Sequence, residues 1–240
     1  MDCPLDVWFL DLAAAPASLA ACELGPLRDD ERLRLGGYLA PAPARRFALA
    51  RVALRILLGE RSGVAPQAVL LDEDVRGKPR RIDGVGGSFS VSHSGERVAI
   101  AISATHELGI DIERRTSFFK PERLYKLACS AAERAWLEAH PARAEEAFGR
   151  LWTRKEALLK SVGMGLRVRP SSIELAARME AADGESEVAG PMAGMRSRAL
   201  WTSLELVGDC HAAVAALARH GETGLAITRH VFDATRLARS

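Results

Sequence analysis

The sequence predicts an α+β fold, in which strands and helices mix without the regular spacing of strand–helix–strand units. Residues 88–103 and 106–116 alternate apolar and polar side chains in the manner of strands. Residues 45–63 and 147–163 instead repeat their apolar side chains at helical spacing. The chain shows no short-period repeat, so a repeat architecture is not expected.

The first half is expected to hold one long helix and several strands. Phe47, Leu54 and Leu58 lie on one face of that helix, which ends at Gly59 or Gly63. The stretch before it is polar and is broken by glycines and prolines, which indicates a turn or loop. The expected elements are a strand at 7–12, this loop at 27–43, the helix within 44–63, a hairpin at 88–103 turning at Ser94 and Gly95, and a strand within 106–116.

The second half is expected to begin with helices. Ser130 precedes Glu133 by three positions, which is the form of a capping box at a helix start. A longer helix follows at 147–163 and ends at Gly163 or Gly165. Residues 180–195 have the composition of a flexible loop. The later strands are expected at 172–175, 199–205, 212–217 and 226–228.

The composition is that of an ordinary globular chain. With 240 residues, 48% hydrophobic residues and a formal net charge of +2, nothing in bulk indicates binding to nucleic acid or membrane. The four cysteines are scattered, so neither a zinc knuckle nor a disulfide framework is indicated, and reduced thiols are expected. Asp2, Asp6 and Asp11 do not fit a secretory signal, and no apolar run is long enough for a membrane span. We therefore expect a cytoplasmic protein.

The segment HELGIDIERRT, residues 106–116, carries two carboxylates on one face of a strand. Residues two apart on a strand point the same way, so Asp111 and Glu113 share a face while Ile110 and Ile112 face the core. Like charges this close repel each other unless a cation lies between them. Mg²⁺ takes such oxygen ligands, together with water and phosphate. Solvated surface carboxylates are the alternative.

The helix at 147–163 adds a third carboxylate. Trp152, Glu156 and Lys160 follow each other at intervals of four and therefore lie along one stripe. Only five of the 33 basic residues are Lys, so Lys155 and Lys160 stand out, and a compact ammonium suits a phosphate oxygen. This set fits the binding of a metal-bound pyrophosphate beside an activated hydroxyl. A Glu–Lys pair beside a partly buried Trp is the simpler alternative.

Two further segments supply groups that could contact an anion. Gly77, Lys78 and Pro79 form an exposed turn, and His93 lies in a Ser-rich strand end near the hairpin tip. A lone His is more often structural than functional, so both roles stay open for His93. The long helix adds a basic flank that is either solvated or binds an anion. Its arginines are Arg46, Arg51 and Arg55.

These motifs together resemble those of a known family. The stretches GKP, SVSHS, GIDIE and LWTRKEALLKSVGMGL occur in the order and approximate spacing of 4′-phosphopantetheinyl transferases of the surfactin-synthetase-activating type. The resemblance runs from about Arg45 to Leu166, and the joint match to W-x-x-K-E-x-x-x-K-x-x-G and G-I-D-I-E is highly specific. It implies a Mg²⁺-dependent enzyme that transfers the phosphopantetheine arm of coenzyme A to a carrier-protein serine and releases 3′,5′-ADP.

The resemblance also implies roles for single residues. It assigns Asp111, Glu113 and Glu156 to the metal, and Glu156 also to deprotonation of the serine hydroxyl. The catalytic set that it implies is Asp111, Glu156 and Lys160. The residues that it implies for coenzyme A are Arg46, Gly77, Lys78, Pro79, Ser92, His93, Lys155 and Lys160.

The family fold implies two similar α/β halves related by a pseudo-twofold axis, with the active site between them. The halves would be residues 1–115, with the GKP, SHS and GIDIE motifs, and 116–240, with the helix of the third carboxylate. The shorter holo-acyl-carrier-protein synthases carry one such half and trimerise, so a monomer is expected for this longer chain. Where some relatives have lysines for the 3′-phosphate, this chain offers only Arg28, Arg32 and Arg34.

The implied partners are apo carrier proteins or carrier domains of fatty-acid, polyketide or nonribosomal-peptide synthases, with no nucleic acid and no membrane. Phe118, Phe119 and Tyr125 are either a docking patch for an acidic carrier helix or part of the core. Two other functions fit the residues. One is a Mg²⁺-dependent nucleotide hydrolase or phosphotransferase that uses the same acids, and the other is a non-catalytic module that binds carrier proteins.

Overall fold

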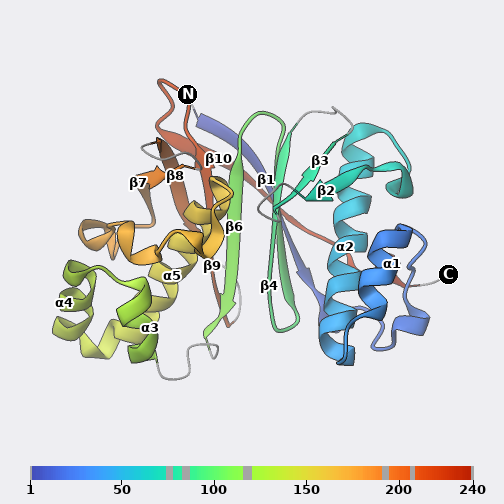
Figure 1. The fold of residues 1–240 in the computed structure, drawn as a ribbon, viewed down its shortest axis with the longest axis horizontal. Coiled ribbons are helices and arrows are strands. Elements are labelled where there is room, and N and C mark those ends of the chain that lie inside the picture. The colour runs from blue at the N-terminus through green and yellow to red at the C-terminus, as the bar shows by residue number, and fades with distance from the viewer. Residues whose placement is uncertain are drawn as a thin grey trace.

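Two four-stranded sheets pack face to face, and one long helix covers the outer side of each sheet (Figure 1). The computed structural model describes residues 2–73, 78–82, 87–115, 121–190, 195–205 and 209–238. The fold is therefore α+β, as the sequence predicts. None of the helices within these ranges is both long and apolar enough to cross a membrane.

The strands and helices follow each other along the chain without a regular alternation. The strands are β1 (Asp2–Asp11), β2 (Leu71–Glu73), β3 (Pro79–Arg81), β4 (Ser88–Ser94), β5 (Arg97–Ser103), β6 (Leu108–Arg114), β7 (Asp183–Ala189), β8 (Arg196–Leu204), β9 (Cys210–Leu217) and β10 (Gly224–Val231). The α-helices are α1 (Asp29–Gly36), α2 (Pro41–Ser62), α3 (Pro121–Ala128), α4 (Ala131–Ala139) and α5 (Ala144–Ser161).

The two large sheets divide the chain differently from the predicted halves. The first sheet has the order β10-β1-β5-β4, and β10 pairs parallel to β1. The second has the order β6-β9-β8-β7, with antiparallel pairs throughout. Thus β6, expected at the end of the half 1–115, belongs to the second sheet, and β10, within 116–240, belongs to the first. The short strands β2 and β3 pair with each other.

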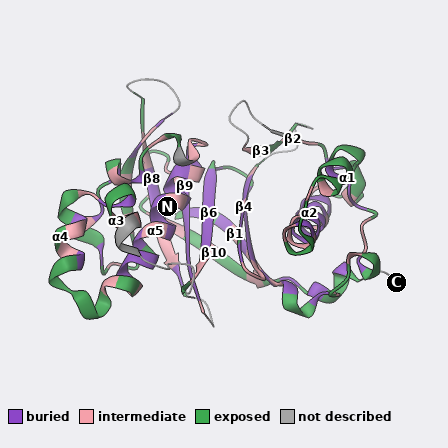
Figure 2. Ribbon diagram, turned by 60° about the horizontal axis from the view of Figure 1, so that its bottom comes forward, coloured by how far each residue is buried: buried purple, intermediate pink, exposed green. Residues whose placement is uncertain are grey.

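Alternation along β5 explains how the layers stack. Val98, Ile100 and Ile102 point outward and join the core under α2. Ala99 and Ala101 point inward and join the core between the two sheets. Small side chains on the inner face let the sheets approach each other. A third core lies between the second sheet and α5. Figure 2 shows that the strands in the middle of the molecule are mostly buried, whereas the helices on either side have exposed outer faces.

Most of the expected elements are confirmed. The hairpin is β4 and β5, and its turn begins at Gly95, whose φ of +58° is a backbone conformation that favours glycine. The long helices expected within 44–63 and at 147–163 correspond to α2 and α5. At the start of α4, the Ser130 side chain and Glu133 make both reciprocal bonds of a capping box.

Three expectations about secondary structure are wrong. The polar stretch at 27–43 contains the helix α1, whose buried residue is the charged Glu31. Glu31 accepts from Arg55 at 2.7 and 3.0 Å and also pairs with Arg51 at 3.5 Å. The presumed loop at 180–195 contains β7, an edge strand whose exposed acidic residues give no apolar signal. Residues 172–175 form no strand, because a 3-10 turn at Pro170–Ser172 occupies the start of that stretch.

Candidate active site

The two sheets meet at an edge where alternate serines of β4 face β6. Ser90 Oγ accepts a hydrogen bond from a backbone amide of β6 at 3.2 Å. Ser92 Oγ donates to Asp111 Oδ1 at 2.9 Å, and Ser94 Oγ donates to Glu113 Oε2 at 2.8 Å. Side chains therefore join the edge strands of two different sheets and orient the carboxylates of β6.

A glycine lets α5 pack directly on β6. A Cβ at Gly109 would lie 2.1 Å from the carbonyl oxygen of Ala157 and 2.6 Å from the Cβ of Lys160, so only glycine permits this approach. As a result, the stripe of Trp152, Glu156 and Lys160 reaches the same side of β6 as its carboxylates.

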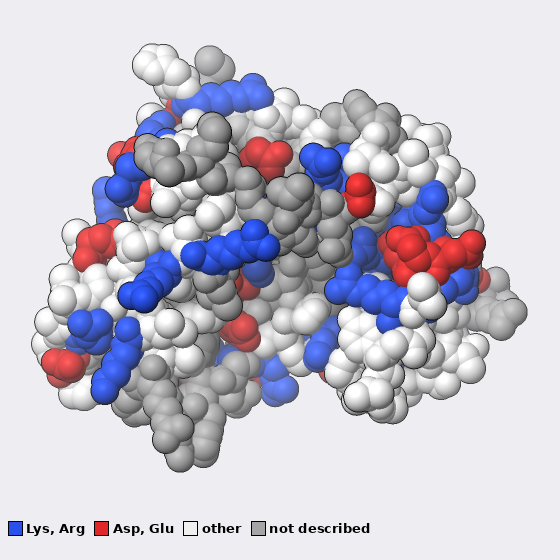
Figure 3. All heavy atoms as spheres, viewed as in Figure 1, with Lys and Arg blue, Asp and Glu red and all other residues white. Residues whose placement is uncertain are grey.

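The carboxylates line one cavity, which we call the carboxylate hollow, of about 290 Å³. Asp111 in it is buried with 4% exposure, so the solvated-surface alternative is wrong for this residue. On the face drawn in Figure 3, a few acidic and basic side chains are exposed in the middle of the molecule. The hollow is lined by Val91, Ser92, His93, Asp111, Glu113, Trp152, Glu156 and Lys160.

Lys160 neutralises one of the acids. Its Nζ lies 2.7 Å from Asp111 Oδ1 and donates also to Ser92 Oγ at 3.0 Å and to the carbonyl oxygen of Ile110 at 3.1 Å. Two carboxylate oxygens remain buried without a hydrogen-bond partner in the described part of the chain: Asp111 Oδ2 and Glu156 Oε1. Buried polar atoms normally have partners, and two carboxylate oxygens in one hollow are able to bind a cation.

The hollow disfavours negative charge on Glu156. Burial and the charge of Asp111 raise its pKa to about 7, although Lys160 acts in the opposite direction. The oxygens of Asp111, Glu113 and Glu156 do not all lie within 4.8 Å of one another. Among the described residues, three metal-binding side chains come that close only elsewhere in the fold.

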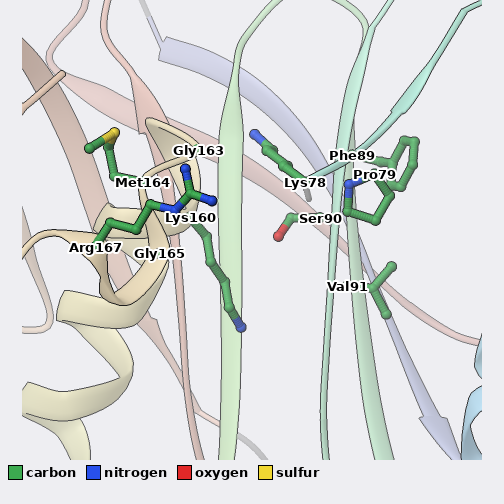
Figure 4. Close-up of a pocket in the computed structure, with 10 residues that line it drawn as sticks. All are labelled: Lys78, Pro79, Phe89, Ser90, Val91, Lys160, Gly163, Met164, Gly165 and Arg167. Carbon is green, nitrogen blue, oxygen red and sulfur yellow. The ribbon is translucent and has the colours of Figure 1, made fainter. Parts of the chain in front are cut away.

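A second pocket of about 560 Å³ adjoins the carboxylate hollow, and both cavities are lined by Val91 and Lys160. Lys78 reaches it from the first half and Arg167 from the loop after α5 (Figure 4). Lys78 Nζ donates to Glu107 Oε2 at 3.0 Å. Pro79 also lines this pocket, whereas Gly77 lies outside the described residues.

His93 and Arg46 are neighbours at the first-half side of the carboxylate hollow. Loss of water contact and the positive charge of Arg46 lower the pKa of His93. Arg46 donates to the carbonyl oxygen of Gly95 at 3.3 Å. At neutral pH, Arg46 therefore carries the positive charge of this pair.

Lys155 does not reach either cavity, which corrects its predicted role in binding coenzyme A. Its side chain is fully buried in the second half, where Nζ bonds Glu133 Oε2 at 2.5 Å and the carbonyl oxygen of Ala128 at 2.8 Å. The physical reason is helical geometry: neighbours in a helix are rotated by about 100°, so Lys155 leaves the stripe of Glu156.

The structure also places two of the remaining basic and aromatic candidates. Arg55 is buried and holds α1, so it is not part of a solvated or anion-binding flank. Tyr125 packs on Phe148 with ring centroids 4.7 Å apart and contacts the core of the second half. Phe118 and Phe119 lie outside the described residues.

Sequence reasoning missed Ser94 and Arg167. The alternating serines of β4 are a visible signal, but of these serines only Ser92 is among the residues that the resemblance implies for the site. Arg167 gave no signal, because it stands among many arginines in a loop and reaches the pocket only through the fold.

Comparisons with known proteins agree with these motifs. The model of the 4′-phosphopantetheinyl transferase superfamily matches residues 107–215, which include β6 and α5. The 4′-phosphopantetheinyl transferase HetI of Nostoc sp. is 34% identical over 195 residues, covering 79% of this chain and 78% of the relative. A phosphopantetheinyl transferase of Thraustochytrium sp. is 26% identical over 249 residues, or 94% of this chain and 82% of the relative.

A shorter match gives the same family. The 4′-phosphopantetheinyl transferase AcpT of Salmonella typhi is 36% identical over 125 residues, covering 52% of this chain and 62% of the relative. The chain therefore belongs to the 4′-phosphopantetheinyl transferases.

Proposed function

We propose that this enzyme transfers the 4′-phosphopantetheine arm of coenzyme A to a serine of an apo carrier protein, with Mg²⁺, and releases 3′,5′-ADP. The serine oxygen forms a bond to the phosphorus that carries the pantetheine arm. The diphosphate P–O bond breaks, 3′,5′-ADP leaves, and the hydroxyl proton passes to a base of the enzyme. One observation carries the proposal: two buried carboxylate oxygens, which have no hydrogen-bond partner among the described residues, lie in the carboxylate hollow beside a larger pocket.

The residues of the carboxylate hollow fit a magnesium ion. Asp111, Glu113 and Glu156 supply only oxygen ligands, and Asp111 Oδ2 and Glu156 Oε1 lack other partners in the described chain. A bound Mg²⁺ would supply charge neutralisation for these acids and for the diphosphate of coenzyme A. Ser92 and Ser94 support this role, because they already hold two of the carboxylates in place.

Glu156 is proposed to accept the proton of the carrier serine. Its carboxyl group lines the same hollow as Asp111 and Lys160, and a carboxylate there can accept a hydroxyl proton. It lies on the rigid helix α5, which supports its positioning. Asp111 is proposed to contribute to catalysis as a ligand of the metal in the same hollow.

Lys160 is proposed to hold a phosphate of coenzyme A. It lines both cavities, so a change of rotamer would carry its ammonium from Asp111 to a phosphate oxygen. The larger pocket would take the nucleotide, with Lys78 and Pro79 on the adenine side. Arg46 and His93 would contact the 3′-phosphate, for which Arg46 supplies the charge.

We further propose the surfactin-synthetase-activating type, acting as a monomer of two related halves. Two sheets with one long helix each, in a single chain, support this arrangement. The proposed partners are carrier domains of fatty-acid, polyketide or nonribosomal-peptide synthases. A cytoplasmic location is proposed from the four free cysteines.

Intact-mass spectrometry tests the function directly. The enzyme is incubated with coenzyme A, Mg²⁺ and a panel of apo carrier domains, and at least one carrier is expected to gain the mass of one phosphopantetheine. A chelator should abolish the gain, and so should Asp111→Asn. Release of adenine nucleotide without modification of any carrier would identify a hydrolase and overturn the proposal.

A further inference from the structure

A buried group of metal-binding side chains lies apart from the carboxylate hollow. Cys3, His106 and Glu222 each offer one donor atom, and these atoms lie within 4.8 Å of one another. Cys3 and His106 are buried, and the Glu222 side chain is 12% exposed. The three residues come from the start of β1, the link between β5 and β6, and the link between β9 and β10. Figure 1 shows the N-terminus beside the last of these links.

The chain already holds two of the three side chains in orientations that suit a metal. His106 Nε2 faces Glu222, with Oε1 at 2.9 Å and Oε2 at 3.1 Å. The other ring nitrogen, Nδ1, is 2.7 Å from Thr105 Oγ1, and the backbone amide of Arg219 donates to Glu222 Oε2 at 2.8 Å. Metal-binding histidines and carboxylates normally have such outer partners, which fix the ring and the oxygen.

The sulfur distinguishes this group from an ordinary buried ion pair. A His–Glu pair needs no third group, yet the Sγ of the free, buried Cys3 lies within 4.8 Å of the donor atoms of both His106 and Glu222. Sulfur, imidazole nitrogen and one carboxylate are ligands typical of zinc and unlike the all-oxygen set that Mg²⁺ prefers. One thiolate and one carboxylate would also balance the two positive charges of the ion.

We infer that Cys3, His106 and Glu222 form a zinc site that ties the two sheets together. The fourth position falls to a water or to the second Glu222 oxygen. Burial raises the pKa of the Cys3 thiol to about 12, so the ion must displace the thiol proton, which leaves to solvent. Because Cys3 lies in β1 and Glu222 just precedes the paired strand β10, while His106 precedes β6, the ion would link both sheets.

Cobalt substitution in the full chain tests this site. The chelator-treated protein is titrated with Co²⁺ in excess Mg²⁺, so that the carboxylate hollow is occupied, and then with Zn²⁺. We expect one equivalent of Co²⁺ with a thiolate-to-metal charge-transfer band that Zn²⁺ abolishes. Zinc at about 100-fold above its Kd should raise the Tm by about 5–10 °C.

Matched variants assign the ligands. Cys3→Ser should lose the band and the zinc-dependent Tm increase, whereas Cys210→Ser, another buried cysteine of the same inter-sheet core, should keep both. If Cys3→Ser does not fold, Glu222→Gln, with its partly exposed side chain, should weaken cobalt binding by at least about 10-fold. Absence of the band in the wild type, or its persistence in folded Cys3→Ser, would overturn the inference. Neither result bears on transfer to carriers, which is measured separately.

Discussion

Replacing Glu156 by Gln should stabilise the metal-free protein at alkaline pH while it abolishes transfer. Burial and the charge of Asp111 raise the pKa of Glu156 to about 7. Above that pH, the folded protein holds a carboxylate where its charge is disfavoured. Gln has the shape of the protonated acid and carries no charge, so the variant lacks this unfavourable term. The carboxylate that the proposed reaction requires therefore lowers the stability of the metal-free fold, as residues of functional sites commonly do.

The size of the effect follows from the pKa. The difference between the ordinary value of 4.5 and about 7 corresponds to about 3 kcal/mol, at about 1.4 kcal/mol for each pKa unit. Glu156 binds its proton more tightly in the folded than in the unfolded chain. Its contribution to stability is therefore complete below pH 4.5 and is lost as pH rises through 7. The advantage of Gln should be small at pH 5 and reach about 1–3 kcal/mol at pH 8, since solvent in the hollow reduces it.

Urea unfolding with a chelator, at pH 5 and pH 8, measures this difference for wild type and Glu156→Gln. The control is Glu145→Gln, at an exposed position in the first turn of the same helix, which should change stability by only a few tenths of a kcal/mol. Saturating Mg²⁺ should then stabilise the wild type more than the Gln variant at pH 8. A variant no more stable than wild type at pH 8, or an equal gain at both pH values, would refute the reasoning.

Three further substitutions test other parts of the site. Lys160→Ala should weaken coenzyme A binding by about 10- to 100-fold, the worth of one charged hydrogen bond, as measured by calorimetry. Lys155→Met should destabilise the protein by about 3–5 kcal/mol in urea unfolding, because it leaves Glu133 buried and unpaired. Ser94→Ala should lower Mg²⁺ affinity by about 10-fold, since it removes the hydroxyl that orients Glu113.

Each of these predictions has a clear contrary result. Unchanged coenzyme A affinity in Lys160→Ala would remove this lysine from the phosphate site. A stable Lys155→Met with weakened coenzyme A binding would restore Lys155 to the active site. For Ser94, the matched control is Ser88→Ala in the same strand, where the hydroxyl bonds Glu107 instead of a proposed ligand. Equal Mg²⁺ affinity in both variants and wild type would contradict a positioning role.

The sequence was most informative where the periodic spacing of residues within one strand or helix determines which side chains share a face. Alternation in β6 places Asp111 and Glu113 on one face, and the four-residue spacing in α5 places Glu156 and Lys160 on one stripe. The same helical period already excluded Lys155 from that stripe. The resemblance nevertheless implied a role for Lys155 at the site, whereas in the structure its ammonium pairs with Glu133 inside the core.

The sequence was least informative where the structure depends on contacts between residues that are far apart in the sequence. No local signal indicates that β10 pairs with β1, more than 200 residues earlier in the chain. The helix α1 depends on the buried ion pair of Glu31 and Arg55, and no periodic pattern of apolar residues in the sequence indicates this pair. The group of Cys3, His106 and Glu222 likewise has no recognisable spacing, because three distant links bring it together.

The most direct test of the proposed active site is a crystal structure of the enzyme with coenzyme A and Mg²⁺. We expect one ion bound by Asp111, Glu113 and Glu156 at about 2.1 Å, with the diphosphate on that ion and beside Lys160. The nucleotide should occupy the pocket of Lys78 and Pro79. A diphosphate bound elsewhere, or an ion that leaves Glu156 uncoordinated and distant from the phosphates, would contradict the site.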